Sequence, residues 1–305
     1  MTIDVLLPTR GNHTLLESSL ASLRKQTFRD FRVLILDNSR SESARRYIHG
    51  LSALDERFIC LPCDEILSED INLGRILNFG LSHCQSEFVA RQDDDDVSLP
   101  IRFESQLTAL RKGFHICGTQ GIFVSSEKKF KYATCLPRKH HEMASYMWCG
   151  NPILHTSVLF HRTSVQEIGG YSEDMKHGQD LDLWNRAAVS NLKMMNLDRI
   201  AVLLTTRGDS ITARTLDAGD RYSNLEILTR SQSVPPQEPI RNLYSLTVLL
   251  PSIRKDYREL ARVFWKTPLV ALGAVAILGL AQLKGRVVFF FIGRKALSLR
   301  IPYLD

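Results

Sequence analysis

Four consecutive aspartates, Asp93 to Asp96, are the residues of this chain best suited to chemistry. They follow the apolar run 87–91, which predicts a buried strand, and they precede Pro100, where we expect a helix to begin. The carboxylates should therefore lie where a strand ends, which is the ligand-binding edge of open α/β sheets. Mg²⁺ or a similar hard cation would relieve their mutual repulsion. The alternative is a solvated acidic turn, but the position after a strand, in a basic protein, favours the metal.

The residues before the aspartates alternate between two apolar patterns. Helically spaced segments separate short apolar runs, and Thr14-x-x-Glu17 is a capping-box pattern that predicts a helix start. The short runs predict strands at 3–7, 31–36, 58–61 and 88–90. Strands that alternate with helices form βαβ units and a mostly parallel sheet. We therefore predict an α/β fold with a Rossmann-like central sheet and flanking helices.

The pattern is less regular in the second half of the chain. Further strands are expected at 157–160 and 202–206. The segment Gly178–Trp184 predicts the start of a helix, and the proline-containing segment 231–238 is typical of a linker. We therefore divide the chain into a first domain, residues 1–235, and a helical C-terminal region, residues 236–305.

Charge and cysteine content narrow the class of partner. The chain has 305 residues and a net charge of +6, which favours an anionic partner such as a nucleoside diphosphate or a membrane surface. Nucleic acid is disfavoured, because the basic residues are dispersed and no base-stacking motif is present. Cys60 and Cys63 have CxxC spacing, so a redox pair is an alternative to buried or loop thiols. The chain begins with a predicted core strand rather than a signal peptide, so a reducing, cytosolic setting is expected.

The C-terminal region contains apolar runs with basic flanks. Residues 267–283 carry no charge, lie between Lys266 and Lys284, and are followed by a second apolar run, 287–292. A spanning helix needs about 20 apolar residues, so the first run is at the lower limit. Three interpretations stay open: a hairpin that dips into or lies on the membrane surface, a single span, or a helical pair packed on the main domain.

Eight short motifs occur in order along residues 3–212. They are Asp4-Val-Leu-Leu-Pro-Thr9, Gln26-Thr-Phe-Arg-Asp-Phe31, Val33-Leu-Ile-Leu-Asp-Asn38, Asn72-Leu-Gly74, Asn78-Phe-Gly80, Ala90-Arg-Gln-Asp-Asp-Asp-Asp96, Gly169-Gly-Tyr171 and Gln179-Asp-Leu-Asp-Leu-Trp184. Together they resemble family 2 of the glycosyltransferases, whose fold is called GT-A. The resemblance implies transfer of a sugar from a nucleotide-sugar to an acceptor hydroxyl, with inversion at the anomeric carbon.

The resemblance assigns the aspartates to a metal. The family's DxD motif falls on Asp93-Asp94-Asp95. Asp95 is then expected to ligate a divalent cation, Mn²⁺ or Mg²⁺, and Asp93 to contact the donor ribose or to reach the metal through water. The cation would stabilise the charge that develops on the leaving diphosphate. Asp94 falls on the variable position, and Asp96 is a candidate supporting carboxylate.

The resemblance also implies a set of donor-binding residues. Asp37 and Asn38 fall on the region that binds the nucleobase, where the usual pair is two aspartates. A carboxylate suits a uracil N–H, so a UDP-sugar is the expected donor. Thr9 is expected beside this pair. Asn78 falls on the family's Asn-x-Gly…Arg-Asn segment, and Arg207 is expected to face the diphosphate.

The acceptor side requires a base. A sugar hydroxyl is a poor nucleophile and must lose its proton as it attacks, so a positioned carboxylate assists the reaction. The family's acidic pair falls on Gln179-Asp180, which makes Asp180 the expected base. Gln179 replaces a glutamate and, with Trp184, is expected to bind the acceptor. A helix N-cap is the structural alternative for Asp180, and His155 is open between a core histidine and a site residue.

The leading hypothesis is an inverting enzyme of polysaccharide or glycolipid synthesis. Its expected partners are a nucleotide-sugar and a glycan or glycolipid acceptor, without nucleic acid. It would work in the cytoplasm at the inner face of the plasma membrane, where residues 236–305 would hold it. Two alternatives are a nucleotidyltransferase, weakly supported by Thr9-Arg-Gly-Asn12, and a non-catalytic nucleotide- or glycan-binding relative, supported by Gln179.

Overall fold

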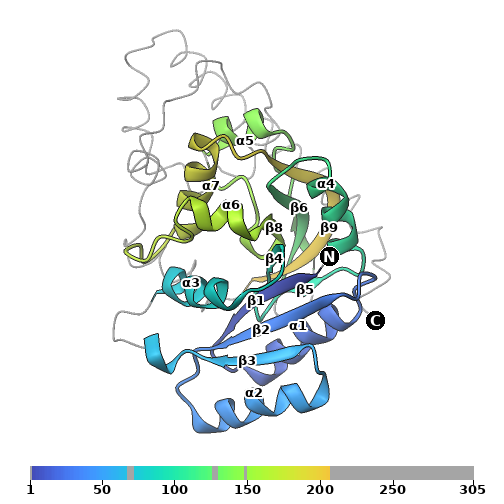
Figure 1. Cartoon of the computed structure of the whole chain (residues 1–305). Coiled ribbons are helices and arrows are strands. Elements are labelled where there is room, and N and C mark those ends of the chain that lie inside the picture. The colour runs from blue at the N-terminus through green and yellow to red at the C-terminus, as the bar shows by residue number, and fades with distance from the viewer. Residues whose placement is uncertain (1, 67–71, 126–129, 148–149, 207–305) are drawn as a thin grey trace.

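One nine-stranded sheet organises the part of the chain that the structure describes, and helices cover both of its faces (Figure 1). The structure is a computed structural model that describes residues 2–66, 72–125, 130–147 and 150–206. The strands are β1 (Ile3–Thr9), β2 (Phe31–Asp37), β3 (Phe58–Pro62), β4 (Phe88–Arg91), β5 (Val97–Ser98), β6 (Ile116–Ser125), β7 (Phe130–Ala133), β8 (Leu159–His161) and β9 (Met194–Thr206). Their order is β3-β2-β1-β4-β8-β6-β9-β5, with β7 paired to β6.

The first four strands form the parallel part of the sheet, as their apolar runs predict. Each is four to seven residues long. Strands β1, β2 and β4 are largely buried, because helices cover both faces of a parallel sheet, whereas the edge strand β3 is mostly half-buried. In the pairing of β1 with β2, Thr9 lies opposite Asp37, and in the pairing of β1 with β4, Leu6 lies opposite Arg91. The polar residues that follow these strands therefore meet at one edge of the sheet.

The second half of the sheet is mixed. Strand β8 joins β4 and β6 antiparallel to both, whereas β6 and β9 run parallel to each other. Strand β9 starts at Met194, eight residues before the apolar run that predicted it, and two register shifts interrupt its pairing with β6. Three consecutive exposed residues, Asp198 to Ile200, interrupt its first half, so no apolar run marks where the strand begins.

The helices divide between the two faces of the sheet. They are α1 (His13–Arg24), α2 (Glu42–Leu54), α3 (Leu73–His83), α4 (Arg102–Leu110), α5 (His140–Tyr146), α6 (Arg162–Glu167) and α7 (Gln179–Val189), with short 3₁₀ helices η1 (Asp64–Ile66) and η2 (His155–Ser157). Apolar side chains of α1, α2 and α4 share one core cluster with Val5, Val33 and Ile35. Those of α3, α5, α6 and α7 share the other with Leu6 and Leu34. Alternate residues of β1 and β2 thus face opposite layers.

Two helix starts differ from the sequence prediction. The side chain of Asn12 caps α1 by accepting a hydrogen bond from the Leu15 N–H, so Thr14 lies inside the helix rather than at its N-cap. Asn12 precedes the first turn and can fold back onto its N–H groups. The helix predicted at Pro100 is present as α4, but it begins two residues later, at Arg102.

The C-terminal predictions lie outside the described residues. This holds for Arg207, for the domain boundary at residue 235 and for the apolar runs at 267–283 and 287–292. Among the helices of the described residues, none is both long enough and apolar enough to cross a membrane.

Candidate active site

The aspartates form a turn between β4 and β5, at the edge where the parallel strands end. Asp93, Asp94 and Asp95 are half-buried, whereas Asp96 is buried. Arg91, the last residue of β4, donates a hydrogen bond from Nη2 to Asp93 Oδ1, and the Asp93 N–H donates to the Thr156 hydroxyl. The turn is therefore held at its first aspartate by a strand on one side and by η2 on the other.

Buried polar side chains anchor the turn from below. Gln92 donates to the carbonyl of Asp96 over 2.8 Å, and Arg102 donates to Gln92 Oε1 over 2.9 Å and to the carbonyl of Arg91 over 2.7 Å. Burial, and the nearby Arg91 guanidinium, lower the pKa of Arg102 to about 9. Because Gln92 and Arg102 are buried and hydrogen-bonded to each other, they hold the backbone of the turn in place.

Negative charge accumulates around Asp96. This carboxyl accepts a hydrogen bond from the Thr205 N–H over 2.9 Å. Burial raises its pKa well above the ordinary value, and the carboxylates of Asp93 and Asp95 raise it further. A cation among these aspartates would stabilise their ionised forms.

The donor set fits a hard divalent cation. Mg²⁺ and similar ions bind carboxylate oxygens, and they are held by one or two carboxylates together with substrate phosphates. Among the described residues, the three-ligand group of metal-binding type is Asp37, His49 and Cys60, not the aspartate run. Asp93 and Asp95 offer carboxylate oxygens, the ligand type that hard cations bind.

Thr9 connects the first strand to the aspartate turn. Its hydroxyl donates to Asp94 Oδ2 over 2.7 Å and accepts a hydrogen bond from the Gly11 N–H over 3.0 Å. Its carbonyl accepts from the Asn38 N–H over 2.9 Å. The structure thus brings Thr9, Asn38 and the aspartate turn together through Asp94, which the motif placed at its variable position.

Asp37 ends β2 beside Thr9. Its Oδ1 accepts a hydrogen bond from the Ser39 N–H over 2.9 Å, and its Oδ2 lies 4.0 Å from His49 Nε2. Sequence reasoning named Asp37 but missed His49, which comes from the middle of α2. Spacing along a single strand carries no signal for a contact with a helix that follows it.

Asp180 lies in the first turn of α7, whose N-cap is Gly178 with a left-handed φ of 79°. Asp180 is therefore inside the helix and not its cap. Its Oδ2 accepts a hydrogen bond from the Asn151 amide and its Oδ1 from the Leu181 N–H over 2.9 Å. Gln179 is only 7% exposed, and its Oε1 has no hydrogen-bond partner among the described residues. A buried acceptor without a donor is a position where a ligand hydroxyl can bind.

A buried aromatic and basic cluster lies between the two acidic sites. It consists of Arg91, Tyr171 and Trp184, each at most 1% exposed, and of His155, which is half-buried. His155 Nε2 and the Tyr171 hydroxyl are hydrogen-bonded over 3.1 Å, and the Trp184 ring stands edge-on to His155 with centroids 6.3 Å apart.

The charges of Asp93 and Asp180 both act on this cluster. Burial raises the pKa of Tyr171, and the Asp180 and Asp93 carboxylates raise it further while Arg91 opposes them. Burial and the Arg91 charge lower the pKa of His155 well below its usual value, so this ring is neutral. Arg91 and Tyr171 were not singled out as site residues, and only their places within two of the motifs pointed to them.

Two predicted site residues make contacts within the fold. Asn78 exchanges hydrogen bonds with Tyr171, donating to its carbonyl and accepting from its N–H, both over 2.8 Å. Its amide thus fastens α3 to the loop before α7. Trp184 is fully buried and belongs to the core cluster of α7.

The cysteines do not form a redox pair in this structure. Burial, and then the Asp37 charge, raise the pKa of Cys60 to about 11 and that of Cys63 to about 12. Both are free thiols, and reactive cysteines need a lowered pKa. The CxxC spacing therefore reflects a strand end rather than a redox motif.

Comparison with known proteins identifies the family. The model described as Glycosyl transferase family 2 matches residues 4–169. The amylovoran biosynthesis glycosyltransferase AmsE of Erwinia amylovora is 29% identical over 203 residues, covering 65% of this chain and 73% of that protein. The UDP-Gal:alpha-D-GlcNAc-diphosphoundecaprenol beta-1,3-galactosyltransferase of Escherichia coli is 26% identical over 221 residues, covering 70% and 75%.

A solved structure shares the fold. The mannosyltransferase PcManGT from Pyrobaculum calidifontis, in complex with GDP-Man and Mn²⁺, superposes with a TM-score of 0.59 at 15% identity, covering 99% of this chain and 81% of that one. The fold is therefore of the GT-A type, as the motifs predicted. Because the family match spans more than half of the sequence, the chain belongs to glycosyl transferase family 2 and is a glycosyltransferase.

Proposed function

We propose that this enzyme moves a sugar from a UDP-sugar to an acceptor hydroxyl, with inversion, in the synthesis of a polysaccharide or glycolipid. The observation that carries the proposal is the buried cluster around Tyr171, which lies within electrostatic reach of both Asp93 and Asp180. An inverting transfer needs a leaving-group site and a base on opposite sides of one sugar. The two acids that flank this cluster suit those roles.

The donor half of the site is assigned to the ends of β1 and β2. Asp37, with Asn38, would read the nucleobase, and Thr9 beside them would keep the aspartate turn in register. The relative from E. coli is named for UDP-Gal, which supports a uridine nucleotide. The fold neighbour PcManGT binds GDP-Man, so the fold alone does not decide the base.

Asp93 and Asp95 would hold a divalent cation together with the donor diphosphate. Such a cation supplies charge stabilisation to the leaving nucleoside diphosphate. The buried Asp96 and the Arg91 side chain would keep these two carboxylates in place, since Arg91 already binds Asp93. Mn²⁺ in the PcManGT complex supports a divalent ion of this kind.

Asp180 would take the proton of the acceptor hydroxyl. Its two oxygens accept hydrogen bonds from Asn151 and from the Leu181 N–H, so the carboxylate is oriented before the acceptor arrives. Gln179 would bind a second acceptor hydroxyl through its unpaired Oε1. A glutamine in place of glutamate keeps this hydrogen bond without adding a second negative charge beside the base.

The acceptor is assigned to a lipid-linked sugar. Two relatives are named for substrates on undecaprenol diphosphate, one of them from E. coli and one from Campylobacter jejuni. Such a substrate stays in a membrane, so an enzyme that uses it must work at a membrane surface. The basic and apolar residues 236–305 would supply that attachment.

Donor binding gives the first test. Thermal shift with UDP-, GDP-, dTDP- and CMP-sugars, each with Mn²⁺, with Mg²⁺ and with chelator, should show a metal-dependent rise for the UDP-sugar. The Asp95→Ala variant should lose that rise while it keeps its own melting temperature without ligand. Stabilisation by a different nucleotide would reject uridine, and equal shifts with chelator would reject the metal.

Turnover gives the second test. With a lipid-linked acceptor, NMR of the product should show the anomeric configuration opposite to that of the donor. Retention would reject inversion. A protein that binds the donor yet transfers no sugar to a panel of lipid-linked acceptors would favour the non-catalytic alternative.

A further inference from the structure

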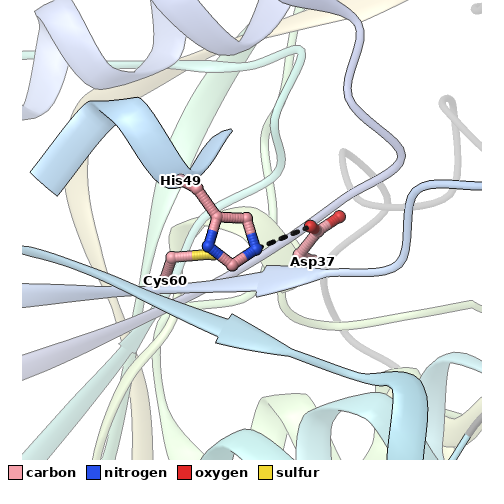
Figure 2. Close-up of side chains that lie close together, drawn as sticks. All are labelled: Asp37, His49 and Cys60. Atoms are coloured by element: carbon pink, nitrogen blue, oxygen red, sulfur yellow. Dashed lines mark ion pairs between the residues drawn. The ribbon is translucent and has the colours of Figure 1, made fainter. Parts of the chain in front are cut away.

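Three side chains of metal-binding type converge beside the proposed nucleobase site (Figure 2). Asp37 ends β2, His49 comes from the middle of α2, and Cys60 comes from β3. One ligand atom from each lies within 4.8 Å of the others, and His49 Nε2 lies 4.0 Å from Asp37 Oδ2. The imidazole stands between the thiol and the carboxylate in Figure 2.

The register of the sheet explains this convergence. Cys60 lies opposite Ile35, and Asp37 is two residues farther along β2, so Cys60 and Asp37 point to the same face. Helix α2 covers that face through Ile48, whose side chain is buried in the same core cluster as Ile35. The residue after Ile48 is His49, at the rim of the helix.

The side chains at this site differ in how far they can move. The Asp37 side chain is 2% exposed and is fixed by the Ser39 N–H on Oδ1, which leaves Oδ2 toward His49. The His49 side chain is 53% exposed and can turn. Tetrahedral zinc, with bonds of 2.0–2.3 Å, needs ligand atoms roughly 3.3–3.8 Å apart. A movement of about 1 Å by the exposed imidazole would supply most of this approach.

We infer that Asp37, His49 and Cys60 form a binding site for Zn²⁺ or a similar borderline-soft cation, separate from the hard-cation site at Asp93 and Asp95. Thiolate and imidazole ligands select zinc over Mg²⁺ and Mn²⁺, which prefer oxygen. Three protein ligands leave a fourth position for water. Binding breaks the S–H bond of Cys60, and the released proton goes to solvent while sulfur keeps the electron pair and ligates the metal.

A metal ion at this site would also control the binding of the sugar donor. This consequence rests on the proposed role of Asp37 as the reader of the nucleobase, whereas the metal site itself does not. A zinc ion on Oδ2 of Asp37 occupies the atom that the base N–H would use. Zinc and the UDP-sugar should therefore compete, so that zinc acts as an inhibitor at a position remote from the diphosphate.

Spectroscopy of the full chain, freed of metal, tests the site. Co²⁺ replaces Zn²⁺ and reports thiolate ligation through a sulfur-to-cobalt charge-transfer band. We expect this band in the parent protein and in the control Cys135→Ser, which removes an exposed thiol outside the cluster. We expect its loss in Cys60→Ser. Zinc affinity, measured by competition with a chromogenic chelator, should fall at least ~10-fold in Cys60→Ser and His49→Gln.

One further variant, Asp95→Ala, and a competition experiment separate the site from the proposed function. Asp95→Ala should keep its zinc affinity, and in the parent protein zinc should weaken UDP-sugar binding, an effect absent from Cys60→Ser. Unchanged zinc affinity in both Cys60→Ser and His49→Gln would overturn the site, while normal donor binding in the same samples would leave the proposed function standing. A different outcome is loss of zinc affinity in Cys60→Ser with no competition between zinc and the UDP-sugar in the parent protein. That result would support the metal site and reject Asp37 as the residue that binds the nucleobase.

Discussion

Asp180 and Asp182 are two carboxylates of one helical turn that have different partners. Asp180 accepts hydrogen bonds from Asn151 and Leu181, and it belongs to the proposed acceptor side. Asp182 forms an ion pair with Arg186 at 2.7 Å, and Arg186 also binds the carbonyls of Ile168 and Gly170. The same residue type is therefore proposed as a base at one position and forms an ion pair within the helix two residues later.

Isosteric substitution at both positions should separate these roles. Asp180→Asn is expected to lower kcat by ~10²-fold or more, because a general base contributes that much, with little change in melting temperature. Asp182→Asn should reduce the free energy of unfolding by about 1–3 kcal/mol, because the Arg186 charge loses its partner, while kcat stays near the parent value. Turnover and urea unfolding of both variants check this. Equal loss of kcat in the two would contradict Asp180 as the base.

His155 should make stability depend on pH. Its pKa in the folded protein lies below 6.5, because the ring is buried and Arg91 is nearby, while Tyr171 and Trp184 complete its surroundings. Below about pH 6.5 the unfolded chain binds a proton that the folded site excludes. The free energy of unfolding should thus have its full value above that pH. Below it, the value should fall by at most ~1.4 kcal/mol per pH unit.

Urea unfolding at several pH values measures this slope. The His155→Gln variant provides the control, because glutamine keeps a hydrogen-bonding group but does not titrate. Its slope between about pH 6.5 and pH 5.5 should be smaller than that of the parent. Identical slopes would show that other groups cause the acid dependence.

At the scale of elements, helix α3 and the loop before α7 act as one unit. Asn78 exchanges two hydrogen bonds with Tyr171. Asn72 caps α3 and donates to the carbonyl of Glu173, and Gly74 packs against the carbonyl of Ser172. These contacts hold Tyr171 in its cluster, so Asn72, Gly74 and Asn78 position a residue of the candidate site from outside it.

A pair of glycines tests this packing. A Cβ at Gly74 would collide with the Ser172 carbonyl, whereas a Cβ at Gly50, on the exposed side of α2, would meet no atom within 4 Å. Gly74→Ala should therefore cost about 1–3 kcal/mol of stability. Gly50→Ala should add about 0.4–1 kcal/mol, because it only restricts the unfolded chain. Chemical unfolding compares them, and a stabilising Gly74→Ala would disprove the contact.

The elements differ in how well the sequence predicts them. Strands β1, β2 and β4 were predictable because helices bury both of their faces, which makes each a short apolar run. The edge strand β3 is mostly half-buried, but its apolar residues Phe58 to Leu61 still marked it. Strand β9 was not, because its first half is exposed at residues such as Asp198 and Arg199. The contact of His49 with Asp37 depends on how α2 lies over the sheet, which no local pattern encodes.

At the scale of the whole molecule, the C-terminal region should decide where the enzyme works. Full-length protein should float with vesicles that contain anionic lipid, and it should bind them less at high salt, because basic residues such as Lys266 and Lys284 flank the apolar run. A chain of residues 1–235 should stay unbound while it still binds the donor. Flotation measures both. Equal binding by the two proteins would assign the membrane contact to the first domain.

The site as a whole was only partly predictable. The places of the aspartate turn and of Asp180 at element ends were predictable, because acids at such positions carry a strong signal. The contacts of Asn78 and the burial of Trp184 were not, because a motif gives the residue type and not the direction of its side chain. The hydrogen bond from Thr9 to Asp94 joins residues 85 positions apart, and such a contact emerges only when the strands are assembled.

The reversal of strand direction between β4 and β8 has an evolutionary consequence. Three residue pairs join these strands, with Val89 opposite Phe160 at their centre. Apart from Arg207, the residues that would hold the activated sugar precede this seam, and those that would receive it follow. The match to the family model ends at residue 169, before Asp180. A lineage can therefore inherit the carrier-binding half unchanged and diversify or exchange the other, so that new surface glycans arise without a new supply of precursor.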